Sequence, residues 1–364
     1  MKDRLKKDVL DLMRVPGLSG HEDRVRREIR QRLEDIGVDS RSDRMGNLVA
    51  DFRGDGPSVM LFTHMDQLGF IVRRIESDGL LRLERLGGVP ERALAAQEVL
   101  ICIAPDKDVP GIIANKSHHA TKPDEKYTVV PYAALYVDCG FKSAAQADAA
   151  GIRIGAPVVY APAARALTED RIAGTSVDDR AGCAVLIEIA RRLKARTSGP
   201  PVHLAFTVQE EFNLRGALPL AQTLKPDIAI QIDLMLASDT PDMEARGDMI
   251  LGGGPGMSLY SFHGRGTLNG VIPHPALVQL AERAASDLGL PLQRSAQTGV
   301  LTDLSYVQLV GEGVAAIDLG FPMRYSHSAR EVCDLNDLVS LTALLEAMLN
   351  GISPTFSLNR DDLA

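Results

Sequence analysis

The chain has 364 residues, more than one hydrophobic core usually supports, so its length predicts two domains or one domain with a large insertion. Apolar residues form 45% of the sequence and aromatic residues only 4%, so Leu, Val, Ile and Ala must supply most of the core. A formal net charge of -8 argues against nucleic acid or an anionic membrane as the main partner, because both bind basic surfaces.

The first 67 residues predict two amphipathic helices followed by two short strands, over residues 2–13, 22–36, 47–52 and 58–62. The second strand leads into Thr63-His64-Met65-Asp66. In an extended segment His64 and Asp66 face the same way, so Asp66 can accept a hydrogen bond from the ring of His64 and fix its tautomer.

The pattern of predicted secondary structure changes between residues 68 and 164, where short β-rich runs recur and only residues 144–150 are expected to form a helix. The predicted strands cover residues 70–75, 80–84, 99–103, 111–114, 134–138 and 157–160. This pattern predicts a small β-barrel domain inserted into an α/β domain that comprises residues 1–67 and 165–364. The polar segment 115–127 is expected to be an exposed loop.

Acidic residues follow two apolar runs in the second part of the chain. A strand is predicted over residues 202–208, directly before Gln209-Glu210-Glu211, and another over 228–232, directly before Asp233. Because ligands of open α/β sheets bind beyond the carboxyl ends of the strands, these acids are expected to converge on one site. The other expected elements are helices over 181–193, 274–288 and 335–348, and strands over 249–251, 257–260, 292–296 and 314–319.

Five candidate ligands stand at predicted strand ends or in adjoining loops: His64, Asp178, Glu211, Asp233 and His327. Two imidazoles and three carboxylates suit Zn²⁺ or Co²⁺ better than Mg²⁺ or Ca²⁺. Such a set can serve two ions about 3.5–4 Å apart if one carboxylate bridges them. Each residue alone has an ordinary explanation as a surface pair, a solvated loop or a helix cap, but adjacent acids at a buried strand end are costly unless a cation neutralises them.

Several motifs together resemble the M42 family of metalloaminopeptidases, over nearly the whole chain. They are Thr63-His64-Met65-Asp66, Val177-Asp178-Asp179-Arg180-Ala181-Gly182, Gln209-Glu210-Glu211, Asp233 with Ser238-Asp239-Thr240-Pro241, and Arg324-Tyr325-Ser326-His327-Ser328. The resemblance implies a mixed-sheet α/β metallopeptidase core with helices on both faces, together with an inserted β-barrel over residues 68–164 that serves oligomerisation.

The resemblance also implies roles for the candidate residues. Asp178 would bridge two divalent ions, Zn²⁺, Co²⁺ or Mn²⁺; His64 and Asp233 would complete one ion, and Glu211 and His327 the other. Glu210 would be the general base. Asp66 is a second catalytic candidate, because it can orient the ring of His64. Three positions depart from the family pattern without removing a ligand: Gln67, Ser326 and the segment 299–303. We expect them to line or neighbour the substrate pocket and so to affect the choice of substrate.

These features predict a two-metal hydrolase that removes N-terminal residues from short peptides by attack of a metal-bridging water. The alternatives are an amidase or deacylase acting on a small non-peptide amide, a binding protein without activity, and a glycosidase. A glycosidase would need two carboxyl groups flanking a sugar ring, about 5–10 Å apart, which the adjacent Glu210 and Glu211 do not naturally provide.

The resemblance further implies a homo-oligomer built from dimers, with a dodecamer as the favoured form. No secretory signal or stretch of about twenty apolar residues is recognisable, so a cytoplasmic protein is expected. The cysteines are widely spaced without a C-x-x-C pair, which favours buried thiols over a disulfide or metal role, at positions Cys102, Cys139, Cys183 and Cys333. The glycine-rich run 252–256 lacks the Lys-Ser/Thr of a phosphate loop and is expected to form a turn.

Overall fold

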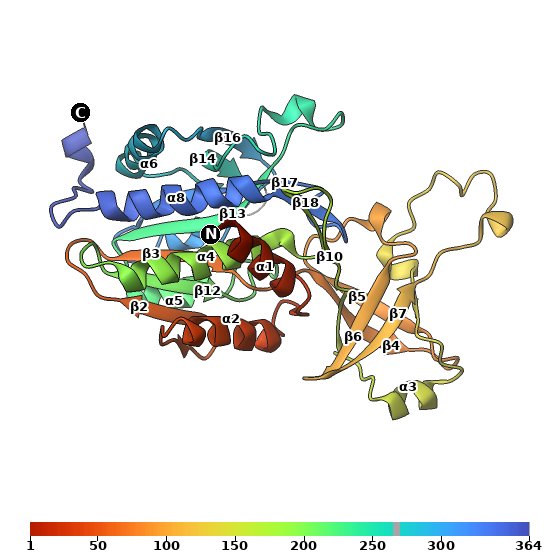
Figure 1. Cartoon of the computed structure of the whole chain (residues 1–364). Helices are drawn as coiled ribbons and strands as arrows, with labels where there is room; N and C mark the ends of the chain where they lie inside the picture. The colour runs from red at the N-terminus through yellow and green to blue at the C-terminus, as the bar shows by residue number, and fades with distance from the viewer. Residues whose placement is uncertain (265–269, 364) are drawn as a thin grey trace.

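The protein combines an α/β part with a closed β-barrel that projects from one side of it (Figure 1). The structure is a computed structural model and describes residues 1–264 and 270–363. The predicted α/β fold with an additional small barrel is confirmed.

One mixed sheet runs through the α/β part. Its main path is β1 (Arg41–Ser42), β2 (Leu48–Phe52), β12 (Val202–Thr207), β3 (Val59–His64), β13 (Ile228–Leu236), β17 (Ala315–Arg324), β18 (Glu331–Asp334), β11 (Arg171–Gly174) and β10 (Ala164–Ala166). The four central strands, β12, β3, β13 and β17, are parallel, whereas β2 and β18 pair antiparallel with them. Strands β14 (Gly256–Phe262), β15 (Gly270–Val271) and β16 (Gln293–Thr298) branch from β17.

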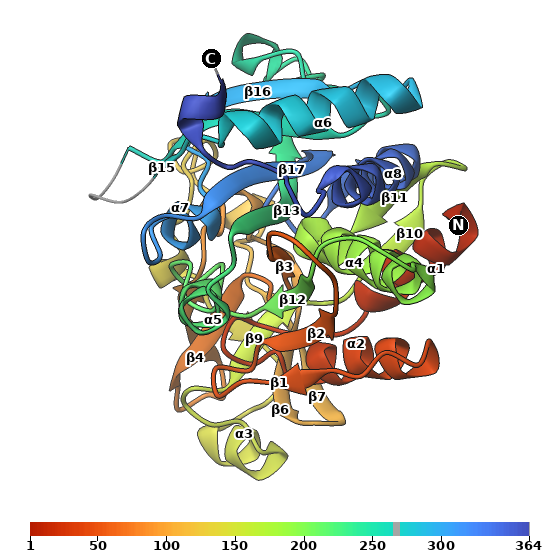
Figure 2. The same ribbon diagram turned by 90° about the vertical axis from the view of Figure 1, so that its left-hand side faces the viewer.

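Helices cover both faces of this sheet, as predicted (Figure 2). Side chains alternate along a strand, so Val59 and Leu61 of β3 pack in one core and Met60 and Phe62 in another. The first core includes α1 (Lys2–Leu12), α2 (Asp23–Asp35), α4 (Val177–Ala195), α6 (Pro275–Leu288) and α8 (Leu335–Gly351). The second includes α5 (Ala217–Leu224) and α7 (Leu304–Val307).

The barrel is closed by six strands in the order β4-β5-β8-β7-β6-β9. Their bounds are β4 Gly69–Ile75, β5 Leu81–Leu86, β6 Glu98–Ala104, β7 Lys107–Ile113, β8 Val137–Asp138 and β9 Pro157–Tyr160. Alternate apolar residues such as Phe70, Val72, Val99 and Ile101 fill its interior. Helix α3 (Ala144–Ala150) forms as expected, and most of the polar segment 115–127 is exposed.

Several predicted boundaries were wrong. Strand β7 begins at Lys107 rather than at residue 111, β8 covers only Val137–Asp138 of the expected 134–138, and β17 continues to Arg324 rather than ending at 319. Strand β13 does not end before Asp233 but continues to Leu236, because the apolar run continues and pairs with β17 as far as Met323.

The helix expected over 181–193 is α4, with bounds Val177–Ala195. Asp178 and Asp179 have non-helical backbone angles, so the regular helix starts close to the predicted residue, and the residues before it are buried.

The expected strand over 249–251 does not form, since its backbone groups bond to side chains rather than to a neighbouring strand. The N–H of Ile250 donates to Gln293 Oε1, and the N–H of Leu251 donates to Asp239 Oδ2. Helix α5 was not predicted; its Pro219 lies in the first turn, where the missing N–H costs least.

Cys183 and Cys333 are buried in the first core, and all four cysteines are free thiols. Among the described residues, no helix is both long enough and apolar enough to cross a bilayer.

Candidate active site

Parallel strand pairing brings the predicted site residues to one edge of the sheet. Thr207, the last residue of β12, lies opposite His64, the last residue of β3. On the other side β3 pairs with β13 up to Gln231 opposite Phe62, and continuing this register would place Asp233 level with His64. The chain therefore carries His64, Asp233 and the segment after Thr207 to a common level.

All five predicted ligands lie together, in two clusters that share Asp178. The first contains His64, Asp178 and Asp233, and the second Asp178, Glu211 and His327; in each cluster candidate ligand atoms lie within 4.8 Å of one another. Asp178 presents a different oxygen to each imidazole: Oδ1 lies 3.0 Å from His64 Nε2, and Oδ2 lies 3.6 Å from His327 Nε2. One carboxylate thus connects the two groups of potential ligands.

The site holds more acid than its burial would tolerate without a cation. Burial raises the pKa of Glu210 and of Asp233 well above the ordinary range, and that of Glu211 to about 7. Burial by itself lowers the pKa of His327, yet Glu211 and Asp178 outweigh it and raise this pKa to about 9. A divalent ion would relieve the repulsion among these carboxylates, so the donor set fits metal binding.

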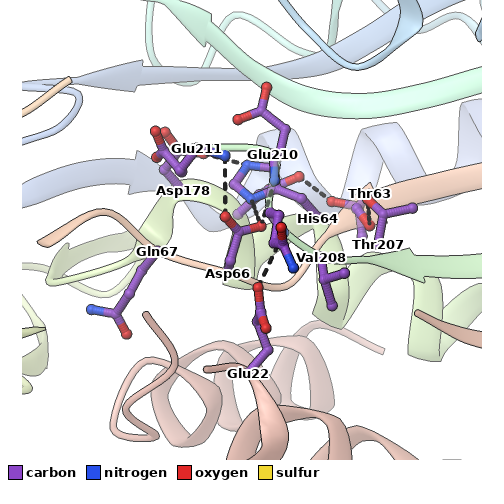
Figure 3. Close-up of polar contacts among 12 residues, drawn as sticks. Glu22, Thr63, His64, Asp66, Gln67, Asp178, Thr207, Val208, Glu210 and Glu211 are labelled. Carbon is purple, nitrogen blue, oxygen red and sulfur yellow. Dashed lines mark hydrogen bonds and ion pairs between the residues drawn. The ribbon is translucent and has the colours of Figure 1, made fainter. Parts of the chain in front are cut away.

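Asp66 positions both the candidate base and the first imidazole (Figure 3). Its buried carboxylate accepts hydrogen bonds from the backbone N–H groups of Glu210 and Glu211, each at 3.1 Å. Oδ1 of Asp66 also lies 3.4 Å from His64 Nδ1, so the two groups face one another as predicted, but the expected hydrogen bond is not formed: Nδ1 has no hydrogen-bond partner among the described residues. Asp66 therefore holds the turn after β12 in place relative to His64.

The rest of this turn is anchored by two residues that were not predicted. Asn47 Oδ1 accepts from the N–H of Val208 at 3.0 Å. Glu22, labelled in Figure 3, accepts through Oε1 from the N–H of Gln209 at 3.1 Å. Together with Asp66, these side chains satisfy four consecutive backbone donors that have left the sheet. No local motif distinguishes Glu22, which looks like any acid at the start of a helix.

Glu331 was also missed, and it holds the shared residue Asp178 and the residue of the second imidazole, His327. Its buried carboxylate accepts from the N–H of Asp178 at 3.1 Å through Oε2 and from the N–H of His327 at 2.8 Å through Oε1. Burial raises the pKa of Glu331 well above the ordinary range. The only sequence signal is an acid four residues after His327, which is too common to indicate a site.

His327 is oriented by the segment that follows the second barrel strand. Its Nδ1 lies 3.0 Å from the carbonyl oxygen of Gly88, and because a carbonyl only accepts, Nδ1 must carry the proton. Nε2 then faces Asp178 and Glu211, where a neutral ring would offer its lone pair. A Cβ at Gly88 would lie 2.8 Å from His327 Nδ1, so this approach favours glycine.

The acid next to Asp178 has a different environment. Asp179 is buried and accepts hydrogen bonds from the hydroxyl of Thr63 and from the N–H of Gly182, the latter at 2.8 Å. A Cβ at Gly182 would overlap the Asp179 carboxylate, which explains the glycine there. Asp179 therefore joins α4 to β3 and is absent from both ligand clusters.

A cavity of about 800 Å³ opens onto the two clusters and also exposes Glu210. Its walls include Ser326 and the segment 299–301, as anticipated, and also His263. Gln67 does not line it, contrary to expectation, because its side chain turns away (Figure 3). Gln67 Oε1 instead accepts from the N–H of Gly17 at 3.1 Å and from Arg180 Nη2 at 3.2 Å.

Comparisons with known proteins identify the family of this chain. A family model described as M42 glutamyl aminopeptidase matches residues 46–344. The lysyl aminopeptidase of Pyrococcus furiosus is 31% identical over 94% of this chain and 96% of its own length.

Solved structures are similar over the same extent. The aminopeptidase APDkam598 of Desulfurococcus kamchatkensis has a TM-score of 0.90 and 30% identity, covering 98% of this chain and 97% of that one. The TET1 peptidase of Pyrococcus horikoshii, which can assemble into a tetrahedron or a large octahedral shell, has a TM-score of 0.84 and 28% identity, covering 95% and 98%.

We expect Glu331→Gln to weaken the binding of Zn²⁺ or Co²⁺ by about 10- to 100-fold, as changes to groups that orient metal ligands do. The new amide would point its NH₂ group at one of the two backbone donors, moving Asp178 or His327. Calorimetric titration of metal-free protein measures this. Glu312→Gln, at an exposed position, is the matched control, and equal affinities for the two variants would contradict the positioning role.

Proposed function

Because this chain belongs to the M42 aminopeptidase family, we propose that it is a two-metal enzyme that removes N-terminal residues from short peptides. The observation that carries the proposal is the shared carboxylate of Asp178, which faces one imidazole with each oxygen. His64 and Asp233 would complete the site of one ion, and Glu211 and His327 that of the other.

The ions, Zn²⁺, Co²⁺ or Mn²⁺, would supply Lewis acidity: they lower the pKa of water towards ~7 and polarise the scissile carbonyl. Glu210 would be the general base, taking a proton from the attacking water and passing it to the leaving amine. Its position in the cavity wall and its backbone bond to Asp66 support this role. The raised pKa of Glu210, due to burial, suits a group that must hold and then release a proton.

Glu210→Gln tests the base. We expect this variant to keep both ions and to lose about 100- to 10,000-fold in turnover of aminoacyl-anilides, because the change removes a proton acceptor but no metal ligand. Metal content and kinetics are measured on the same sample, with Glu312→Gln as the control. Near-normal turnover by Glu210→Gln would refute the role of Glu210 as the base. If the wild type cleaves small non-peptide amides but no aminoacyl-anilide, the aminopeptidase proposal is refuted.

Substitutions of Asp178 and Asp179 test which of these adjacent aspartates is the metal ligand. We expect Asp178→Asn to lose at least one ion and more activity than Asp179→Asn, since Asp178 faces both clusters whereas Asp179 bonds to Thr63 and Gly182. Metal analysis after gel filtration gives the order of the two effects. If Asp179→Asn empties the site and Asp178→Asn does not, the ligand assignment is wrong by one residue.

We also propose that residues 68–164 form an oligomerisation domain, in a dimer or a larger assembly with a dodecamer favoured. Support comes from the assembling TET1 relative and from exposed apolar side chains on this domain. Tyr127 is 94% exposed, and Ile112, Val129 and Val130 are each about half exposed. Such a group on one small domain is typical of an interface.

Light scattering over a dilution series tests the assembly. We expect a multimer that Val129→Asp dissociates, because a buried unpaired charge is costly at an interface. Leu288→Asp, at an exposed apolar position on α6, is the matched control and should leave the multimer intact. A wild-type species with the mass of one chain and full peptidase activity would rule the assembly out.

A further inference from the structure

A small chamber adjoins the metal-ligand clusters and is lined differently from the main cavity. It measures about 20 Å³ and shares four wall residues with the main cavity, namely Asp233, Leu234, Leu236 and Val300. Most of its wall residues belong to β13, β14, β16 and β17. Figure 1 shows β14 and β16 next to each other, where they branch from β17. A substrate held at the clusters would therefore have this chamber beside it.

The inner wall of the chamber is polar and is centred on Asp318 of β17. Ile317 and Leu319 pack in the first core, so Asp318 points to the opposite face, beside its strand partner Gln231. Gln231 Nε2 donates to the candidate ligand Asp233 at 3.2 Å. Continuing the antiparallel register of β14 and β17 would bring Ser258 level with Asp318.

Three buried polar atoms in this wall have no hydrogen-bond partner within residues 1–264 and 270–363: Asp318 Oδ2, Gln297 Oε1 and Ser261 Oγ. Their residues are 1%, 8% and 4% exposed. The other oxygen of Asp318 accepts from the hydroxyl of Thr302 at 3.0 Å. Buried acceptors without donors are costly, so a bound group that donates hydrogen bonds would stabilise this wall. The carboxylate of Asp318 would favour a group that is also positively charged.

The volume of the chamber limits which chemical groups it can hold. A volume of about 20 Å³ holds one group of the size of water, which an ammonium group matches and a planar guanidinium exceeds. The shared wall residues Leu234, Leu236 and Val300 are apolar and could contact the methylene groups of an extended side chain. A carboxylate guest would be repelled by Asp318.

We propose that this chamber is the subsite for the side chain of the substrate's N-terminal residue, and that Asp318 selects a primary ammonium group, as in lysine or ornithine. The inference rests on the proposed aminopeptidase function and deepens it. Burial raises the pKa of Asp318 to about 7, against the opposing hydrogen bond from Thr302, and a bound ammonium would favour the charged carboxylate.

Lysyl and norleucyl anilides test the subsite, because their side chains differ chiefly in the ammonium group. We expect the metal-loaded wild type to favour the lysyl substrate in kcat/KM, and Asp318→Asn to reduce the lysyl-to-norleucyl ratio by about 10- to 100-fold. Ser261→Ala should reduce the ratio by a smaller factor. Asp287→Asn, at an exposed acid on α6, is the matched control and should keep it.

The outcomes separate this inference from the proposed function. An unchanged ratio in Asp318→Asn, with both substrates still cleaved, would show that the chamber holds only a structural water while the peptidase assignment stands. If no anilide is cleaved, calorimetric binding of free lysine and norleucine decides: tighter lysine binding that Asp318→Asn abolishes supports the subsite, and equal binding overturns it. Should Asp318→Asn fail to fold, the ratio for Ser261→Ala decides in the same way.

Discussion

The position of one buried carboxylate, that of Asp178, is the constraint on which the rest of the site depends. Its two oxygens face imidazoles from different parts of the chain, His64 at the end of β3 and His327 in the loop between β17 and β18. A carboxylate in this position is useful only if its backbone and both rings are held still. Much of the surrounding polar structure serves that purpose.

Other acidic side chains near the site fix the backbone of the candidate ligands and the base. Asp66, Glu331 and Glu22 each accept hydrogen bonds from backbone N–H groups next to the candidate ligands or the base. Backbone donors that leave a sheet must find partners, and a buried carboxylate can satisfy two of them at once. Where these acids are ionised they also add negative charge beside the site, which would favour a bound cation. The residues that hold the site rigid are thus also ones that would favour a metal ion.

One face of the sheet carries both the centre and the adjoining chamber. On β13 and β17 the residues Gln231, Asp233 and Asp318 alternate with apolar residues that pack against α4 and α8. The metal-ligand region and the polar chamber are therefore joined through a rigid strand pair. Changes in the chamber can alter the choice of substrate without displacing the ligands.

The sequence by itself determined the local features of this protein. Continuous apolar runs predicted the central strands, the recurrence of short β-rich runs predicted the inserted barrel, and the two-residue spacing of His64 and Asp66 predicted that they share a direction. These predictions succeeded because they depend on periodicities of a few residues. Acids and imidazoles at strand ends indicated the five candidate ligands, and the M42 resemblance added their roles. The structure brings these five residues together.

Only the tertiary structure decided which distant residues support one another. Glu331 and Glu22 are ordinary acids until strand register and helix packing bring them to the backbone of the site. Gln67 was expected near the pocket, but packing turns it towards Gly17 and Arg180. Asp318 becomes noticeable only when its strand lies beside β13 and its Oδ2 is enclosed with no donor in the described part of the chain. Such relations depend on contacts between segments far apart in the chain, and local sequence patterns carry no information about them.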